Sequence, residues 1–247
     1  AFFKIAKENE NIEIVAVNDL GSIESMEYLL KYDSVYGISN FNLKGIKYIS
    51  EKDPAKLPWK DLDIDIVVEC TGLYTATDKA QAHIDAGAKR VVISAPISDD
   101  NSPTVLMAIN EDKLNSTKIS SNASCTTNAG SPLIAILDET LGIEKALLNT
   151  VHAYTASQSL VDGPNKKDGR EGRGAAQNIV PSSTGAAIAV TKVLPKFSGL
   201  FDGIAIRVPV SVGSIVDITF ISKKNTTEEE VNEILKKAAS ENRWNGI

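Results

Sequence analysis

The sequence is poor in cysteine and histidine, with two of each in 247 residues: Cys70, Cys125, His83 and His152. Two cysteines are too few for the disulfide framework of a small secreted protein. They do not form a pair spaced for zinc, so the sequence predicts no metal centre. A reducing cytoplasm is therefore the compartment that we expect for this chain.

Long apolar stretches are missing as well. A membrane-spanning helix needs about 20 consecutive apolar residues, and no run in this sequence approaches that length. The first residues lack the features of a secretory signal. The formal net charge of −6 disfavours a nucleic-acid surface, which is normally basic. We therefore expect no membrane association, and no nucleic acid as the main partner.

What the sequence does contain is a cysteine at a predicted boundary between a strand and a helix. Residues 118–120 favour a strand, and residues 133–141 carry the apolar spacing of a helix. Cys125 lies between them, within SNASCTTN at residues 121–128. The start of a helix presents unpaired backbone N–H groups and a partial positive charge, both of which favour a thiolate. One helix end supplies only about 0.3–1 kcal/mol, so a reactive thiol needs a second positive partner.

The two histidines are the candidates for that partner. His83 lies in a polar-faced helical segment, residues 79–85, and is predicted to be a solvated side chain. His152 follows the strand-like residues 146–151, at a strand end where catalytic groups are often displayed, and is the candidate base. By themselves Cys125 and His152 stay open to a second interpretation, because a buried thiol and a structural histidine would give the same pattern.

Four longer motifs narrow the interpretation. They are SNASCTTN at residues 121–128, HAYT at 152–155, PSSTGAA at 181–187 and RVP at 207–209. Together they resemble the phosphorylating glyceraldehyde-3-phosphate dehydrogenases, and the resemblance runs along nearly the whole chain. Several motifs in one order are far more specific than a single glycine pattern.

The resemblance implies a reaction and two anion sites. The reaction is NAD-dependent oxidative phosphorylation of glyceraldehyde 3-phosphate to 1,3-bisphosphoglycerate in glycolysis, through a thioester on Cys125 with His152 as the base. Thr155 and Arg207 match the family's pocket for the substrate phosphate. The positions that match its pocket for inorganic phosphate are Ser124, Thr126, Thr184 and Gly185. Hydroxyls and backbone N–H groups near helix starts suit an anion.

A cofactor site is expected in the first half of the chain. Asp19 ends the strand-like residues 12–19, and by itself it is consistent with a turn or cap residue. By resemblance Asp19 and Leu20 occupy the ribose-binding position, where an acid accepts hydrogen bonds from the ribose hydroxyls and repels a 2′-phosphate. The expected cofactor is therefore NAD. The other positions that match the family's dinucleotide site are Thr71, Gly72, Ser94 and Ala95.

The first half alternates strand-like and helix-like segments, which predicts a doubly wound, Rossmann-type α/β domain with a parallel sheet. A helix is expected near residues 1–9, and the strand-like segments are residues 12–19, 65–70, 90–96, 104–109 and 118–120. Cys70 is predicted to be a small buried hydrophobe. The second half predicts an α+β catalytic domain from strands at 147–154, 203–210 and 214–222 and helices at 185–194 and 227–239. The expected domains are residues 1–124 and 125–247.

The family's glycine loop is not found in this sequence. Dinucleotide-binding units carry Gly-x-Gly-x-x-Gly about 20 residues before an acid such as Asp19. Counting back from Asp19 reaches the first residue, so we expect a fragment without that loop, its strand and a C-terminal part. The chain alone is expected to show no measurable dehydrogenase activity. Residues 156–173 resemble the family's S-shaped loop between subunits, which implies a homotetramer for the complete enzyme.

Three alternative functions remain at this point. The related erythrose-4-phosphate dehydrogenases share a similar cysteine motif, but they generally lack the TGAA wording at residues 184–187. A non-catalytic remnant that binds RNA or another protein need not keep a reactive Cys125. A cysteine hydrolase is the third alternative, although no group that would orient His152 is evident in the sequence.

Overall fold

The computed structural model describes residues 2–166, 168–182 and 184–247. Contacts within the chain divide it into two units, residues 1–67 with 78–91 and residues 68–77 with 92–247. The division passes through strands β5 (Ile66–Glu69) and β6 (Arg90–Ile93). The predicted domain boundary between residues 124 and 125 stays a prediction.

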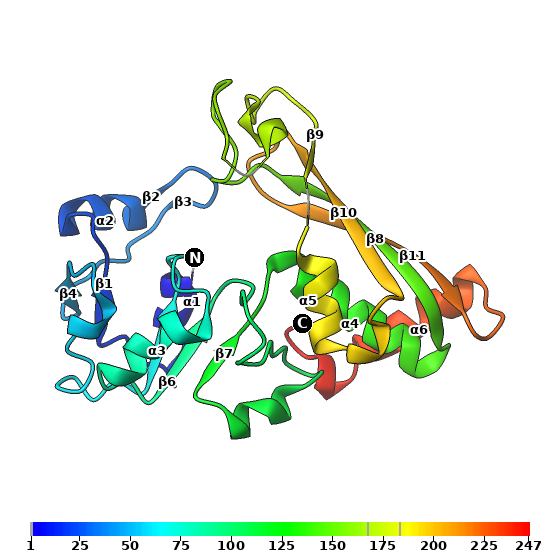
Figure 1. The fold of residues 1–247 in the computed structure, drawn as a ribbon, viewed down its shortest axis with the longest axis horizontal. Helices are drawn as coiled ribbons and strands as arrows, with labels where there is room; N and C mark the ends of the chain where they lie inside the picture. The colour runs from blue at the N-terminus through cyan, green and yellow to red at the C-terminus, as the bar shows by residue number, and fades with distance from the viewer. Residues whose placement is uncertain (1, 167, 183) are drawn as a thin grey trace. The chain divides into compact units, whose positions relative to one another are not determined.

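The first unit begins with helix α1 (Phe2–Lys7), where a helix is predicted. Strand β1 (Ala16–Asn18) pairs in parallel with β4 (Lys47–Ile49). The strand predicted over residues 12–19 is therefore too long, because its partner offers three residues for pairing. The chain segment between β1 and β4 contains helix α2 (Ile23–Lys31) and the short antiparallel pair β2 (Tyr32–Asp33) and β3 (Gly37–Ile38), drawn in blue in Figure 1.

A three-stranded sheet has the order β5-β6-β7, with β7 at Ile119–Ser121, and helix α3 (Thr77–Asp85) connects β5 to β6. The strand predicted over residues 104–109 is wrong. Thr104 makes one parallel bridge to Ser121, but Ala108 has a left-handed φ of 65° that ends extended chain. Asn110 closes the intervening loop, since its side chain accepts from Leu106 N at 2.9 Å and donates to the Thr104 carbonyl at 2.9 Å.

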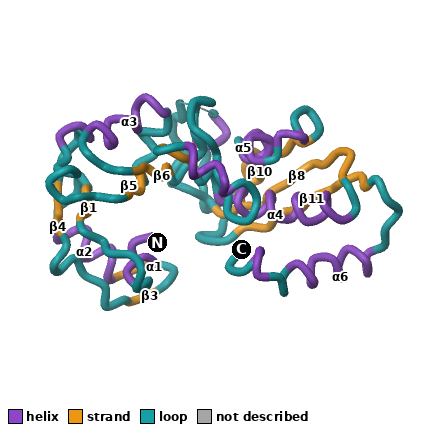
Figure 2. Tube along the Cα trace, turned by 90° about the horizontal axis from the view of Figure 1, so that it is seen from below, coloured by secondary structure: helices purple, strands orange, loops and turns teal. Residues whose placement is uncertain are grey.

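The rest of the chain forms a four-stranded sheet of order β11-β8-β10-β9 with helices on one side. The strands are β8 (Ile143–Ala153), β9 (Val180–Ser182), β10 (Phe201–Val208) and β11 (Ser214–Ser222). The helices are α4 (Cys125–Thr140), α5 (Ala186–Val193) and α6 (Glu228–Ala238). β8 and β10 are parallel, and the other two pairings are antiparallel. The strands and helices predicted for this half are confirmed to within a few residues, and Figure 2 shows them in a second view.

The core of this part lies between the sheet and the helices. Side chains alternate along β8, so that Leu148 is buried while its neighbour Leu147 is 61% exposed. Leu148 packs with Ile134 and Leu137 of α4, Val190 of α5 and Phe197. Burying an aliphatic side chain of this size contributes about 1.5–3 kcal/mol. This packing fixes α4, which begins with Cys125, against β8, which carries His152.

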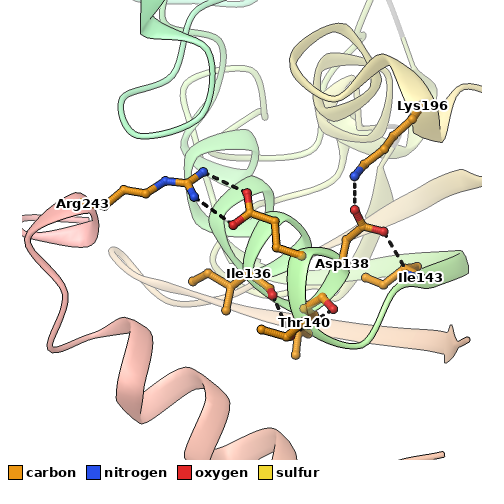
Figure 3. Close-up of polar contacts among 8 residues, drawn as sticks. Ile136, Asp138, Thr140, Ile143, Lys196 and Arg243 are labelled. Atoms are coloured by element: carbon orange, nitrogen blue, oxygen red, sulfur yellow. Dashed lines mark hydrogen bonds and ion pairs between the residues drawn. The ribbon is translucent and has the colours of Figure 1, made fainter. Parts of the chain in front are cut away.

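Polar contacts hold the C-terminal end of α4 (Figure 3). The Asp138 carboxylate accepts from Ile143 N at 3.0 Å and pairs with Lys196. Arg243 donates to both oxygens of Glu139, at 2.8 and 2.9 Å. Next to Arg243, the Trp244 side chain is buried against this region. With one end fixed in this way, the other end of α4 has a defined position.

Two predictions about individual side chains are wrong. His83 is not solvated: it is 4% exposed, and its Nδ1 accepts from Trp59 Nε1 at 3.1 Å. Cys70 is exposed rather than buried. The reason is that β5 lies at the edge of its sheet and buries alternate residues, Val67 and Glu69, so that Cys70 falls on the other face.

Candidate functional site

The turn from β7 into α4 displays Cys125 as the first residue of the helix. Ala123 in this turn has a left-handed φ of 59°, a conformation that costs an alanine roughly 1 kcal/mol. Hydrogen bonds hold it there, from Ala123 N to Ser121 Oγ at 2.9 Å and from Asn128 Nδ2 to the Asn122 carbonyl at 2.7 Å. The predicted position of the cysteine, between a strand and a helix, is confirmed.

Cys125 is exposed, and its Sγ lies 3.3 Å from Nε2 of His152. His152 comes from β8, one residue before the strand ends. On the other side of the ring, Nδ1 lies 2.8 Å from the Ala153 carbonyl and 2.6 Å from NH1 of Arg207. The structure thus brings Cys125, His152 and Arg207 into one chain of contacts.

The sheet register explains why Arg207 reaches the imidazole. Arg207 on β10 stands beside His152 on β8 in the parallel ladder, and Val180 of β9 pairs with it on the other side. Its Nε atom is buried and has no hydrogen-bond partner within the described residues. Arginine presents its donors in a planar fork that suits carboxylate and phosphate. Arg207 is therefore a cation with unused donor capacity beside the histidine.

The remaining predicted phosphate ligands make local hydrogen bonds. Ser124 Oγ caps α4 by accepting from Thr127 N at 3.1 Å, and Thr126 Oγ1 lies 4.0 Å from Cys125 Sγ. Thr155 Oγ1 lies 3.1 Å from Ser157 Oγ. At the start of α5, Thr184 Oγ1 accepts from Ala186 N at 3.1 Å, and Gly185 is the N-cap residue of that helix. Apart from Thr126, these residues contact their own neighbours rather than Cys125 or His152.

Two of the predicted cofactor residues lie in the first unit, directly after β1. The Asp19 carboxylate accepts from Gly21 N at 2.8 Å through Oδ1, which is the turn-closing role that an aspartate commonly takes. Within the described residues Oδ2 has no hydrogen-bond partner. The Leu20 side chain is exposed.

The other four cofactor residues follow β5 and β6. Gly72 has a φ of 72°, so a residue with a side chain would be strained there. Thr71 N donates to the Glu69 carboxylate at 2.6 Å, and Ser94 N donates to the Glu69 carbonyl at 3.0 Å. The Ala95 carbonyl accepts from Ser121 Oγ at 2.6 Å.

Glu69 thus accepts hydrogen bonds from both turns, the one after β5 and the one after β6. The sequence analysis did not identify this residue. Its side chain is 4% exposed although it is an acid. The available signal was an ionisable residue at the end of the apolar run 66–68, a position where burial requires hydrogen-bonding partners.

The described residues contain no helix that is long and apolar enough to cross a membrane. Nor do they contain a group of three or more His, Cys, Asp or Glu residues that could hold a metal ion.

Two family models and several curated proteins match this chain. The family model described as glyceraldehyde 3-phosphate dehydrogenase, NAD binding domain, matches residues 1–77, and the one described as the C-terminal domain of the same enzyme matches residues 124–247. A glyceraldehyde-3-phosphate dehydrogenase of Buchnera aphidicola is 50% identical over 256 residues, covering 99% of this chain and 76% of that protein. One from Chlamydia muridarum is 50% identical, covering 96% and 74%. One from Citrobacter freundii is 46% identical, covering 99% and 86%.

These matches confirm the predicted fold class, a Rossmann-type α/β domain followed by a catalytic domain, together with NAD as the cofactor and the oxidoreductase class. The chain belongs to the glyceraldehyde 3-phosphate dehydrogenase family.

Proposed function

We propose that this chain oxidises glyceraldehyde 3-phosphate with NAD through a covalent intermediate on Cys125, and that inorganic phosphate releases the product as 1,3-bisphosphoglycerate. The observation that carries this proposal is the 3.3 Å contact between Cys125 Sγ and His152 Nε2 at the start of a 16-residue helix. A nucleophile and a base at hydrogen-bond distance are what covalent catalysis requires.

The two residues divide the chemistry between them. The Cys125 sulfur adds to the aldehyde carbon and gives a hemithioacetal, whose hydroxyl proton passes to Nε2 of His152 as the carbon is oxidised. A phosphate oxygen then attacks the resulting thioester, and the bond to sulfur breaks to restore the Cys125 thiolate. The Nδ1 side of His152 faces a backbone carbonyl and an arginine rather than the Asp or Asn side chain of a hydrolase triad, which disfavours the alternative of a cysteine hydrolase.

NAD, when bound, supplies the acceptor for the hydride that leaves the substrate carbon. Asp19 suits this cofactor because the oxygen that does not close the turn can accept from ribose hydroxyls. Gly72 suits it because a Cβ built there meets no atom within 4 Å, which leaves backbone open to a ligand. The residues that we assign to the cofactor are Asp19, Leu20, Thr71, Gly72, Ser94 and Ala95.

Two anions need separate partners. We assign the substrate phosphate to Arg207 and Thr155, because the buried Nε of Arg207 has no partner within the described residues. The attacking phosphate is assigned to the starts of α4 and α5, where backbone N–H groups favour an anion. In that site Ser124 acts by capping α4, since its hydroxyl is already engaged with Thr127. The remaining members are Thr126, Thr184 and Gly185.

The test is NADH formation from glyceraldehyde 3-phosphate and NAD, with and without inorganic phosphate. Because this chain spans part of the length of its relatives, the assay uses a form extended by the Buchnera segments that it does not match. We expect NADH formation that depends on phosphate. An equal rate of NADH formation with and without inorganic phosphate would contradict the phosphorylating step. A higher rate with erythrose 4-phosphate than with glyceraldehyde 3-phosphate would favour the related erythrose-4-phosphate dehydrogenase instead.

We also propose that the complete enzyme is a cytoplasmic homotetramer. The free thiols of Cys70 and Cys125 suit a reducing compartment. On the open face of the four-stranded sheet, Leu147, Ile204 and Ile215 are 61%, 58% and 68% exposed. Several large apolar side chains exposed on one face of a sheet favour a protein interface there.

The assembly is tested by light scattering on the extended form. Ile204→Glu should lower the measured mass, because it places a charge in the apolar face. Ile188→Glu is the matched control, since Ile188 is 65% exposed on α5, away from that face. Equal masses for the two variants would contradict an interface on the sheet.

A further inference from the structure

Two turns lie side by side where β6 and β7 end, and each carries part of the proposed site. The turn after β6 contains Ser94 and Ala95, which are assigned to the cofactor. The turn after β7 leads to Cys125. Backbone pairing between the two strands reaches as far as a hydrogen bond from Asn122 N to the Ile93 carbonyl, at 2.9 Å. The residues that carry the chemistry come after this bond in both turns.

The Ser121 hydroxyl connects the two turns beyond the backbone pairing. Ser121 is the last residue of β7 and is 1% exposed. Its Oγ donates to the Ala95 carbonyl at 2.6 Å and accepts from Ala123 N at 2.9 Å. A hydroxyl has one donor and two acceptor positions, so it can make both bonds at the same time. One side chain therefore contacts both a residue assigned to the cofactor and the turn that carries the nucleophile.

Ser121 is itself held in place by the neighbouring segment of chain. Its backbone N donates to the Pro103 carbonyl at 3.0 Å, and its carbonyl accepts from Val105 N at 2.8 Å. Because the side chain is buried in a closely packed interior, it has little room for another rotamer. A group whose own support is fixed in this way can in turn fix the groups that it contacts.

The two hydrogen bonds of the hydroxyl have different consequences. The bond from Ala123 N stabilises the turn before Cys125, where Ala123 adopts a left-handed φ of 59° that is uncommon for an alanine. Ala95 is not part of that turn, so the bond to its carbonyl does something else. It sets the position of the turn after β6 relative to the turn that carries Cys125.

Hydride transfer depends on this relative position. In the proposed reaction the carbon bound to Cys125 gives its hydride to NAD and its hydroxyl proton to His152, which leaves a thioester and NADH. The turn after β7 carries that carbon, and the turn after β6 is assigned to NAD. Reacting atoms must come within about 3–3.5 Å of each other, and a misplacement of about 1 Å can lower the rate roughly 100-fold.

We propose that Ser121 is a positioning residue that holds the turn after β6 at the distance from Cys125 that hydride transfer requires. This inference rests on the proposed function, in which Cys125 holds the substrate and Ser94 and Ala95 contact NAD. The Ser121 hydroxyl acts through Ala95 and Ala123 rather than on the substrate itself. Its removal therefore slows the oxidation step while NAD still binds and Cys125 still reacts.

Four variants of the extended form separate the two hydrogen bonds. Ser121→Ala removes both of them. Ala123→Gly allows the left-handed turn without help from the hydroxyl, because glycine adopts a positive φ readily. The double variant Ser121→Ala with Ala123→Gly therefore lacks only the link to Ala95. Ser120→Ala is the matched control, since Ser120 is the preceding residue of β7, is 5% exposed, and makes no side-chain hydrogen bond within the described residues.

Four measurements distinguish binding, thiol reactivity, oxidation and the state of the turn. Calorimetric titration gives the Kd for NAD, and iodoacetamide alkylation gives the reactivity of Cys125. NADH formed in a single turnover without inorganic phosphate gives the rate of oxidation. Hydrogen exchange of the peptide that contains Ala123 reports on the turn before Cys125.

At saturating NAD we expect the double variant to oxidise glyceraldehyde 3-phosphate roughly 10–100-fold more slowly than Ala123→Gly does. Its Kd for NAD and its alkylation rate should stay within about threefold of the values for Ala123→Gly. Ser121→Ala should be at least as slow, and its Ala123 N–H should exchange faster because the acceptor is gone. Ser120→Ala should match the unmodified form in every measurement. The double variant decides the matter if Ser121→Ala does not fold.

Several results would overturn the inference. If the double variant oxidises the aldehyde as fast as Ala123→Gly, Ser121 acts only on the conformation of the turn before Cys125. A normal rate for Ser121→Ala at saturating NAD, or an equal loss in Ser120→Ala, would also contradict the role of the hydroxyl. These results leave the proposed function intact when the unmodified extended form makes NADH in a phosphate-dependent way. An unmodified extended form that makes no NADH would count against the proposed function and the inference together.

Discussion

Gly130→Ala is expected to separate the two elements that hold Cys125 and His152. Gly130 lies on α4, and a Cβ built at this position would be 2.8 Å from Cδ1 of Leu148 on β8. Leu148 is 1% exposed, so its side chain has little room to move. Because α4 carries Cys125 and β8 carries His152, a shift at Gly130 acts on the 3.3 Å contact between Sγ and Nε2.

Two opposing contributions determine how much Gly130→Ala changes the free energy of unfolding. Overpacking a core by one methyl group costs about 1–3 kcal/mol, and replacing glycine by alanine inside a helix gains roughly 1 kcal/mol. We therefore expect Gly130→Ala to lower the free energy of unfolding by about 0–2 kcal/mol. Leu148→Val removes about one methylene, worth roughly 1 kcal/mol, and makes the space that the alanine methyl needs. The free energy of unfolding of the double variant should be about 1 kcal/mol higher than the value obtained by adding the changes measured for the two single variants.

Urea unfolding followed by circular dichroism measures these free energies. Iodoacetamide alkylation, with Cys125 and the exposed Cys70 distinguished by mass spectrometry, reports on the contact with His152. Gly130→Ala should slow alkylation of Cys125 several-fold, and the double variant should restore it. Free energies that add within about 0.3 kcal/mol, together with an unchanged alkylation rate, would refute the reasoning.

Three further predictions concern single residues. Cys125→Ser should abolish NADH formation by the extended form and leave its circular dichroism unchanged, because a serine hydroxyl is scarcely ionised and makes a poor acyl carrier; activity within tenfold of the unmodified form would contradict the assignment. Asp19→Gly should narrow the preference for NAD over NADP by roughly tenfold or more, and equal use of both cofactors by the unmodified enzyme would rule out its role. The backbone N–H and hydroxyl of Thr77 hold the pKa of the Asp99 carboxyl below its usual value. Asp99 therefore stabilises the fold above its unfolded pKa of about 3.9, and this contribution is lost as the pH falls through the lower folded value. Asp99→Asn should accordingly destabilise the chain at neutral pH by an amount that shrinks in acid, and a difference independent of pH would contradict this account.

Local sequence predicted the elements whose boundaries depend on short-range chemistry. Strand β11 has the bounds predicted for it, residues 214–222, and helix α6 begins within one residue of its predicted start, where the Thr227 hydroxyl caps it by accepting from Glu230 N at 3.3 Å. The position of Cys125 followed from the change of periodicity at residues 121–128. His83 was misjudged because its burial depends on Trp59, a residue 24 positions away that no pattern near His83 reveals.

The arrangement around His152 could not be predicted for a related reason. Arg207 reaches Nδ1 because β10 lies next to β8 in a parallel register, and strands that are not consecutive in sequence carry no local mark of their pairing. The resemblance assigned both residues to the site but gave no contact between them. The role of Glu69 likewise depends on hydrogen bonds to Thr71 and Ser94, which lie on different turns.

The two tryptophans give each unit of the chain its own fluorescent reporter. Trp59 is buried in the first unit, where its indole N–H donates to His83, and Trp244 is buried in the second, with the Arg243 guanidinium 4.4 Å from its ring centre. An indole changes its emission when it leaves such surroundings for water. Trp59→Phe leaves Trp244 as the only tryptophan, so its emission reports the unfolding of the second unit. Trp244→Phe leaves Trp59, whose emission reports the unfolding of the first unit. Coincident transitions would mean that the units unfold together, and separate transitions would give each its own stability.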